Sequence, residues 1–234
     1  MQEPDPRLEE AIAATVVARV PKQYLATFGV TNIHYYLLSE PSYADLAPDD
    51  EEEVVVREGN VVSEPPAIVT PTYMLNLEGF SSNARRYMEK LEHNRDSQSP
   101  GLMYRYRNEP SEMNIVTGQI KTIAGRITTD LDGRGENSAA VIMGVDALWD
   151  VSLLKFILDY TSKSLASNVG EMNAMGLLDP DPNTRVPRAA IQRIDQLFSQ
   201  VEQGLDPSVL RQELNRWGLF EYYQDRFLAL FRRK

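Results

Sequence analysis

The side chains that most often catalyse reactions or bind metals are scarce in this sequence. It contains no Cys, which excludes disulfides, thiolate zinc sites, iron–sulfur clusters and cysteine nucleophiles. It contains two His, the residue that most readily exchanges protons near neutral pH. His93 lies in a polar stretch and is expected to be solvated. His34 is therefore the one histidine that we consider as a catalytic residue.

His34 lies in an aromatic stretch, directly before Tyr35 and Tyr36. Two interpretations fit this position. His34 is either a general base in a pocket or a half-buried strand residue that is hydrogen-bonded to a neighbour. We favour the second interpretation, because no motif in the sequence supplies a catalytic partner.

Motifs for other common chemistries are absent or incomplete. The sequence has neither the Gly-x-Ser-x-Gly motif of a serine nucleophile nor the Gly-Lys dipeptide of a Walker loop. Two loops begin with the spacing of a calcium-binding EF-hand, at Asp130 and Asp179. Their twelfth positions are Val141 and Ala190, where a bidentate carboxylate is required. We therefore predict no metal, no cofactor and no enzymatic activity.

Charge and hydropathy restrict the environment of the chain. Its 234 residues include 24 Lys and Arg against 34 Asp and Glu, a net charge of −10 that favours solubility and repels nucleic-acid backbones. The longest apolar runs are too short to cross a bilayer. The first ten residues, MQEPDPRLEE, lack the basic and apolar regions of a signal peptide. These features predict a cytoplasmic protein without a membrane partner.

The first 146 residues have mixed helical and strand patterns. Apolar spacing predicts the helices, while β-branched and aromatic runs predict the strands. We expect helices over residues 6–20, 70–77, 81–91 and 120–130. We expect strands over 30–38, 54–56, 61–62, 102–107 and 113–116, with turns at 57–60 and 109–111, and either a last strand or a helix start at 139–143.

The segment 102–107 alternates two kinds of side chain. Successive strand residues point to opposite faces of a sheet, so Tyr104 and Tyr106 share one face while Arg105 and Arg107 share the other. Aromatic and basic residues on one face could bind nucleic acid, but here they are separated. We expect a buried tyrosine face and a solvated arginine face.

The remaining sequence has helical patterns only. We expect helices over residues 147–160, 164–176, 187–203, 207–215 and 219–232, separated by prolines and glycines. The fold class is therefore α+β, with a mainly antiparallel sheet in the first part. We predict an α+β domain over residues 1–140 and a helical domain over 141–234, with the option of one shared core.

Residues 151–187 contain an apolar helix, a small polar turn, a second helix from Ser164 and a polar, proline-rich stretch after Gly176. This order resembles the end of a winged helix-turn-helix domain. The resemblance implies that the first turn of a recognition helix would contact DNA through Lys163, Ser164, Ser167 and Asn168. Ordinary helix packing explains the same residues, and the surrounding carboxylates oppose DNA binding.

The last predicted helix is the most aromatic in the chain. Phe220, Tyr223, Phe227 and Phe231 recur on one stripe, and Trp217 precedes them. The stripe either closes the core or docks a partner protein, and its spacing favours the core. If it docks, these five aromatic residues are the candidate contacts.

Binding is thus the function that the sequence favours. We expect a non-enzymatic cytoplasmic protein that binds another protein through its helical half. The first alternative is a DNA-binding transcriptional regulator that uses residues 151–187. The second is a metal-independent enzyme that uses His34.

Overall fold

The computed structural model describes residues 6–43, 52–69, 75–78 and 101–232. Its fold is α+β, as predicted. The chain divides into two compact units. The sheet unit comprises the described parts of Met1–Pro65, Leu75–Arg95 and Tyr104–Asn168, and the helical unit comprises those of Pro66–Met74, Asp96–Met103 and Val169–Lys234. The last division along the chain falls after Asn168, within the helix Trp149–Ala174, so the strand 139–145 and the first part of that helix belong to the sheet unit.

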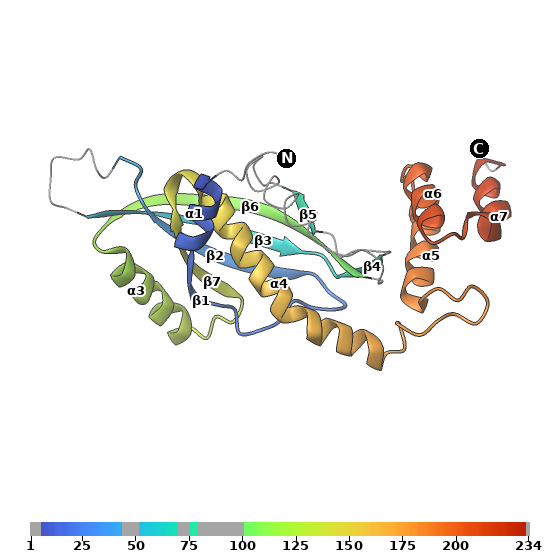
Figure 1. Ribbon diagram of the computed structural model, residues 1–234, viewed down its shortest axis with the longest axis horizontal. Coiled ribbons are helices and arrows are strands. Elements are labelled where there is room, and N and C mark those ends of the chain that lie inside the picture. The colour runs from blue at the N-terminus through green and yellow to red at the C-terminus, as the bar shows by residue number, and fades with distance from the viewer. Residues whose placement is uncertain (1–5, 44–51, 70–74, 79–100, 233–234) are drawn as a thin grey trace. The chain divides into compact units, whose positions relative to one another are not determined.

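The described strands form one seven-stranded sheet in the order β1-β7-β2-β3-β6-β4, with β5 paired to β6 (Figure 1). β2 and β7 are parallel, as are β5 and β6, whereas the other pairs are antiparallel. The strands are β1 (Val16–Arg19), β2 (Thr31–Glu40), β3 (Glu53–Ser63), β4 (Ala67–Val69), β5 (Leu75–Glu78), β6 (Gly101–Thr117) and β7 (Ala139–Val145).

Helices cover both faces of the sheet. The α3 helix packs on the face that carries alternate residues of β2, β3 and β7, in a cluster that contains Leu38, Val54, Val56, Ile123, Ala124, Leu131, Ala139 and Val141. The α4 helix runs across the opposite face and hydrogen-bonds to tyrosines of β6 (Figure 1). The helices of this part are α1 (Pro6–Ala14), α3 (Ile120–Gly133), η2 (Asp146–Leu148) and α4 (Trp149–Ala174).

The alternation predicted for β6 is confirmed. Tyr104 and Tyr106 are buried on the α4 face. Arg107 is exposed and Arg105 is partly exposed, so the cations remain in contact with solvent.

Two predicted hairpin turns are wrong, because each segment is one long strand. β3 passes straight through residues 57–60, since Gly59 lies under the ring of Tyr35, where a Cβ atom would come 2.5 Å from the tyrosine hydroxyl. β6 continues through residues 109–111 with an irregularity in its register opposite Gly59. Gly59 therefore leaves space for the Tyr35 side chain and does not form a turn.

Other predictions differ in length or type. The first helix ends at Ala14 and the chain continues as β1, while residues 75–78 form β5 instead of the end of a helix. The predicted helix over 81–91 lies outside the described residues. Residues 139–143 belong to a strand, the first of the two alternatives.

The helical unit contains α5 (Arg188–Glu202), α6 (Pro207–Arg216) and α7 (Phe220–Arg232), each within a few residues of its predicted bounds. These helices bury one apolar cluster of Ile194, Leu197, Phe198, Leu210, Leu214, Leu219 and Phe227. The unit therefore has a hydrophobic core of its own.

Candidate functional site

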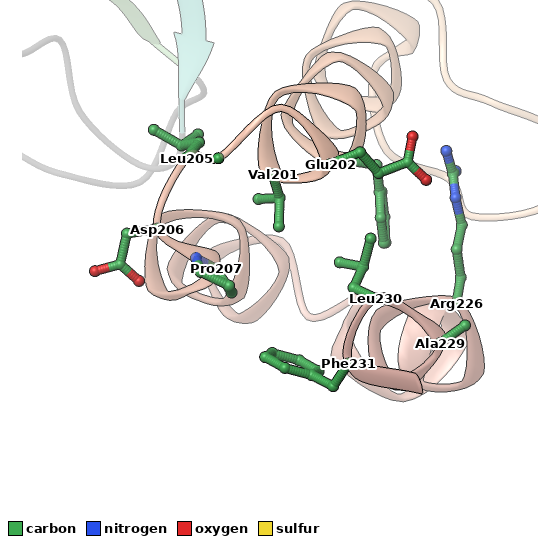
Figure 2. Close-up of a pocket in the computed structure, with 11 residues that line it drawn as sticks. Val201, Glu202, Leu205, Asp206, Pro207, Arg226, Ala229, Leu230 and Phe231 are labelled. Carbon is green, nitrogen blue, oxygen red and sulfur yellow. The ribbon is translucent and has the colours of Figure 1, made fainter. Parts of the chain in front are cut away.

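A pocket of about 720 Å³ lies between α5, α6 and α7. Figure 2 shows the side chains that line it, which come from the last turns of α5 and α7 and from the loop that joins α5 to α6. They are Phe198, Val201, Glu202, Gly204, Leu205, Asp206, Pro207, Arg226, Ala229, Leu230 and Phe231. Most of these residues are apolar, and three of them are charged.

Two local sequence features determine the path of the loop that lines the pocket between α5 and α6. Gly204 has a φ of 112°, a conformation that suits glycine and lets the chain leave α5. Asp206 then starts α6: its Oδ1 accepts a hydrogen bond from the backbone N–H of Ser208 at 2.8 Å, and Pro207 follows at the first helical turn. This hydrogen bond lowers the pKa of Asp206, so its carboxylate is ionised at neutral pH.

The charged residues lie on two sides of the pocket. Figure 2 shows Glu202 and Arg226 on one side and Asp206 on the other. Arg226 is held by Asp195, whose Oδ1 lies 2.5 Å from the guanidinium, and by the ring of Phe198, 4.0 Å below it. The pocket therefore combines apolar side chains with three charged ones.

The five aromatic docking candidates are distributed unequally. Phe227 is buried, and Trp217, Phe220 and Tyr223 pack against the same core, where burial raises the pKa of Tyr223. Phe231 differs, because 53% of it is exposed and it lines the pocket. Of the predicted docking residues, the structure thus brings only Phe231 to the pocket.

Sequence reasoning missed the α5 side of the pocket. Phe198, Val201 and Leu205 follow each other at helical spacing, which predicts an apolar face but does not tell a core face from a binding face. Their position next to Gly204 and Asp206 was the available clue.

The candidate nucleic-acid contacts lie elsewhere, on α4. The expected turn between two helices is wrong, since α4 is continuous from Trp149 to Ala174. Ser164 and Asn168 are fully buried, so they are not accessible for the DNA contacts that the resemblance implies. Lys163 is exposed and Ser167 is partly exposed. The buried pair instead holds the segment that precedes β2.

That segment is attached to α4 by hydrogen bonds. The Ser164 hydroxyl accepts from the backbone N–H of Leu25 at 3.1 Å. The Asn168 amide donates to the Leu25 carbonyl at 2.7 Å and to the Thr27 hydroxyl at 2.8 Å, and its oxygen accepts from the Tyr104 hydroxyl at 2.6 Å. Ser164 and Asn168 therefore have a structural role.

His34 lies on β2 with two polar neighbours from β3. Its Nδ1 is 3.2 Å from the Asn60 amide oxygen, and its Nε2 is 3.6 Å from a Glu58 carboxylate oxygen. The ring of Tyr36 packs edge-on against it, and 33% of the His34 side chain is exposed. A carboxylate beside an imidazole is compatible with proton transfer, and a catalytic role for His34 stays a prediction.

Comparisons with known proteins give no assignment. No family model, curated protein or solved structure matches this chain. The resemblance of residues 151–187 to a winged helix-turn-helix domain therefore stays a prediction.

The part of the chain that the structure describes lacks two further features. Within it, no group of three or more His, Asp or Glu side chains is placed to hold a metal ion. Among the same residues, none of the helices combines the length and the hydropathy that a membrane crossing requires.

Proposed function

We propose that this chain is a non-enzymatic, cytoplasmic binding protein whose pocket in the helical unit holds an amphipathic helix of a partner protein. The observation that carries the proposal is the pocket of about 720 Å³ with its half-exposed Phe231. Exposed apolar surface next to a cavity loses contact with water when a partner covers it, and this loss of contact favours association.

Apolar side chains line the pocket from two sides. Phe198, Val201 and Leu205 line it from α5 and the residues after it, while Ala229 and Leu230 line it from α7. Recognition of a helix in a groove uses apolar side chains at i, i+3 and i+4, which insert between such walls. An amphipathic helix therefore fits the shape and the chemistry of this pocket.

The packing of the pocket walls against the core of the helical unit favours a preformed site. Phe198 is buried under Arg226, and Phe227 packs against both Phe220 and Phe231 with ring centroids 5.5 Å apart in each pair. A preformed surface loses little conformational entropy on binding. We therefore expect Phe231 and the neighbouring Leu230 to contribute most of the binding energy.

The test blocks the pocket without disturbing the core. Ala229 is exposed and lines the pocket, so Ala229→Trp should fill its opening while the unit stays folded. Leu228→Trp is the matched control, because it adds the same ring to the same helix at an exposed position outside the pocket lining. Folding of both variants is checked by circular dichroism and thermal unfolding.

Binding is measured by quantitative affinity capture from cell extract. The proposal predicts a protein that the wild type and Leu228→Trp retain and that Ala229→Trp loses, and a synthetic helix from that protein must compete for binding. Equal capture by all three proteins, or no protein that depends on the pocket, contradicts the proposal. Competition by a small apolar molecule but by no peptide contradicts it as well, because it would identify a ligand site.

A further inference from the structure

The second half of β6 lies at a margin of the sheet. β3 pairs with one side of β6 over residues 106–117, whereas β5 pairs with the other side over residues 104–107 only. Beyond residue 107, none of the described strands pairs with that other side (Figure 1). The backbone N–H and C=O groups of such an edge can extend the sheet by pairing with another strand.

Two large apolar side chains are exposed along this edge. Met113 is 64% exposed and Ile115 is 55% exposed. They share one face of the sheet, because alternate residues of a strand point to the same side. Val55, which pairs with Ile115 on the neighbouring strand, is only 5% exposed. Burial on this face therefore ends at β3, and the side chains of β6 are left uncovered.

The other parts of the sheet margin have features that oppose pairing with a further strand. β1, at the opposite margin, is four residues long and has an irregular register with β7. On β6 itself, Pro110 has no N–H to donate, and the register is irregular opposite Gly59. Residues 113–117, with the sequence MNIVT, contain no proline, no glycine and no charge. This stretch therefore has none of the protection that exposed edges usually carry.

We infer that this edge pairs with the same edge of a second copy of the chain, antiparallel around a two-fold axis at Asn114. In this register Met113 lies opposite the second copy's Ile115, and Ile115 lies opposite its Met113. Asn114 lies opposite its own copy, and Glu112 lies opposite Val116. The two Glu112 side chains are then four residue positions apart, about 14 Å along the strands. Apolar residues face apolar residues, and no like charges face each other.

This self-complementarity is the reason to assign a second copy as the occupant. A two-fold interface brings the same surface of both subunits together, so its residues must suit themselves. Moving the axis to a neighbouring residue keeps the faces of the two sheets matched but separates the apolar pair. With the axis at Met113, Ser111 lies opposite Ile115, and with the axis at Ile115, Thr117 lies opposite Met113. Only the axis at Asn114 pairs both apolar side chains.

The inference goes beyond the proposed function and is independent of it. The edge belongs to the sheet unit, whereas the pocket belongs to the helical unit. Failure of either proposal therefore leaves the other unaffected.

The absence of Cys from the chain makes a direct test of the register possible. In Asn114→Cys, the axis brings the two Cα atoms to about 5 Å, within the range of about 4.4–6.8 Å that a disulfide spans. This variant should form a disulfide-linked dimer under mild oxidation. Glu112→Cys is the matched control, because it is exposed on the same face of the same strand but lies about 14 Å from its copy. It should remain mostly unlinked.

The dimer without a crosslink is measured by analytical ultracentrifugation of the full chain over a range of concentrations. The wild type should show a dimer whose fraction rises with concentration. Ile115→Lys should weaken this dimer about tenfold, since the change occurs twice in a symmetric interface. Met175→Lys is the control, because Met175 is 68% exposed and lies outside the sheet. It should dimerise as the wild type does.

Circular dichroism and thermal unfolding check that every variant is folded. A wild type that stays monomeric at all concentrations overturns the inference, whatever else covers the edge. Equal crosslinking of Asn114→Cys and Glu112→Cys overturns the register and the axis. A dimer that ignores Ile115→Lys overturns the inference as well, because the copies then associate through another surface.

Discussion

The buried amide of Asn168 offers a direct test of how the sheet unit is held together. Asn168→Ala removes three hydrogen bonds, to Leu25, Thr27 and Tyr104, whose lengths are between 2.6 and 2.8 Å. Each bond contributes about 1 kcal/mol, and each buried polar group left unpaired costs about 1–3 kcal/mol. A water molecule that enters the space would recover part of this loss. We expect the variant to lose about 3–4 kcal/mol of unfolding free energy.

The two tryptophans allow this loss to be assigned to the correct unit. Trp149 starts α4 in the sheet unit and Trp217 lies in the helical unit, so a Trp217→Phe background reports the sheet unit by fluorescence. Urea unfolding then gives the free energy change. Ser162→Ala, an exposed position on the same helix, is the control and should change stability by less than about 0.5 kcal/mol.

A double-mutant cycle tests the mechanism. Tyr104→Phe removes one of the three bonds and should cost about 1–2 kcal/mol. Combined with Asn168→Ala it should add little, since the shared bond is already lost, and the interaction energy should exceed about 0.5 kcal/mol. An Asn168→Ala variant within about 1 kcal/mol of the wild type, or a cycle that is strictly additive, refutes the reasoning.

Two further changes probe other contacts of the sheet unit. Burial alone raises the pKa of Asp146, but hydrogen bonds from Arg57 and neighbouring groups outweigh it and lower the pKa. The stability from this pair is therefore present above the unfolded-state pKa near 3.9 and is lost as pH falls through the lower folded value. Asp146→Asn should cost about 2 kcal/mol of unfolding free energy at pH 7. It should also reduce the loss of stability at acidic pH, measured by urea unfolding between pH 2 and 7. An unchanged loss of stability at acidic pH contradicts this prediction. Gly59→Ala should lose about 1–3 kcal/mol of unfolding free energy, because its Cβ would meet Tyr35. Gly125→Ala, in open space within α3, should instead gain about 0.5–1 kcal/mol of unfolding free energy. Equal effects of the two variants in thermal unfolding would contradict the steric explanation.

Elements with a clear one-sided pattern could be predicted from the sequence. α5 and α7 have apolar stripes that match the core they bury, and α6 has the cap signal Asp206-Pro207. β2 is rich in β-branched and aromatic residues, and it is a central strand with partners on both sides. In these cases the local preference and the tertiary environment agree.

The predictions were wrong where a residue type that is typical of a turn is instead required by a contact with a residue distant in the sequence. Gly59 is followed by Asn60, which is typical of a turn, but the glycine is needed because Tyr35 lies over it. Pro110 interrupts the pattern of β6, yet its strand continues with an irregular register at that point. A single sequence contains no sign of the distant side chain that decides each case.

The same limit applies to the residues of α4 that the DNA-binding alternative used. Polar residues at helical spacing, such as Ser164 and Asn168, are expected to face solvent and so to be available to a ligand. On α4 they face a sheet whose tyrosine hydroxyls need partners, and burying a hydroxyl without one costs more than the hydrogen bond contributes. Tyr104 and Tyr106 therefore require polar partners on that face of α4.

The apolar stripe of the last helix is ambiguous in a different way, because core residues and docking residues have the same spacing in the sequence. Only their exposure separates Phe227 from Phe231, and this difference locates the proposed binding surface at the end of α7.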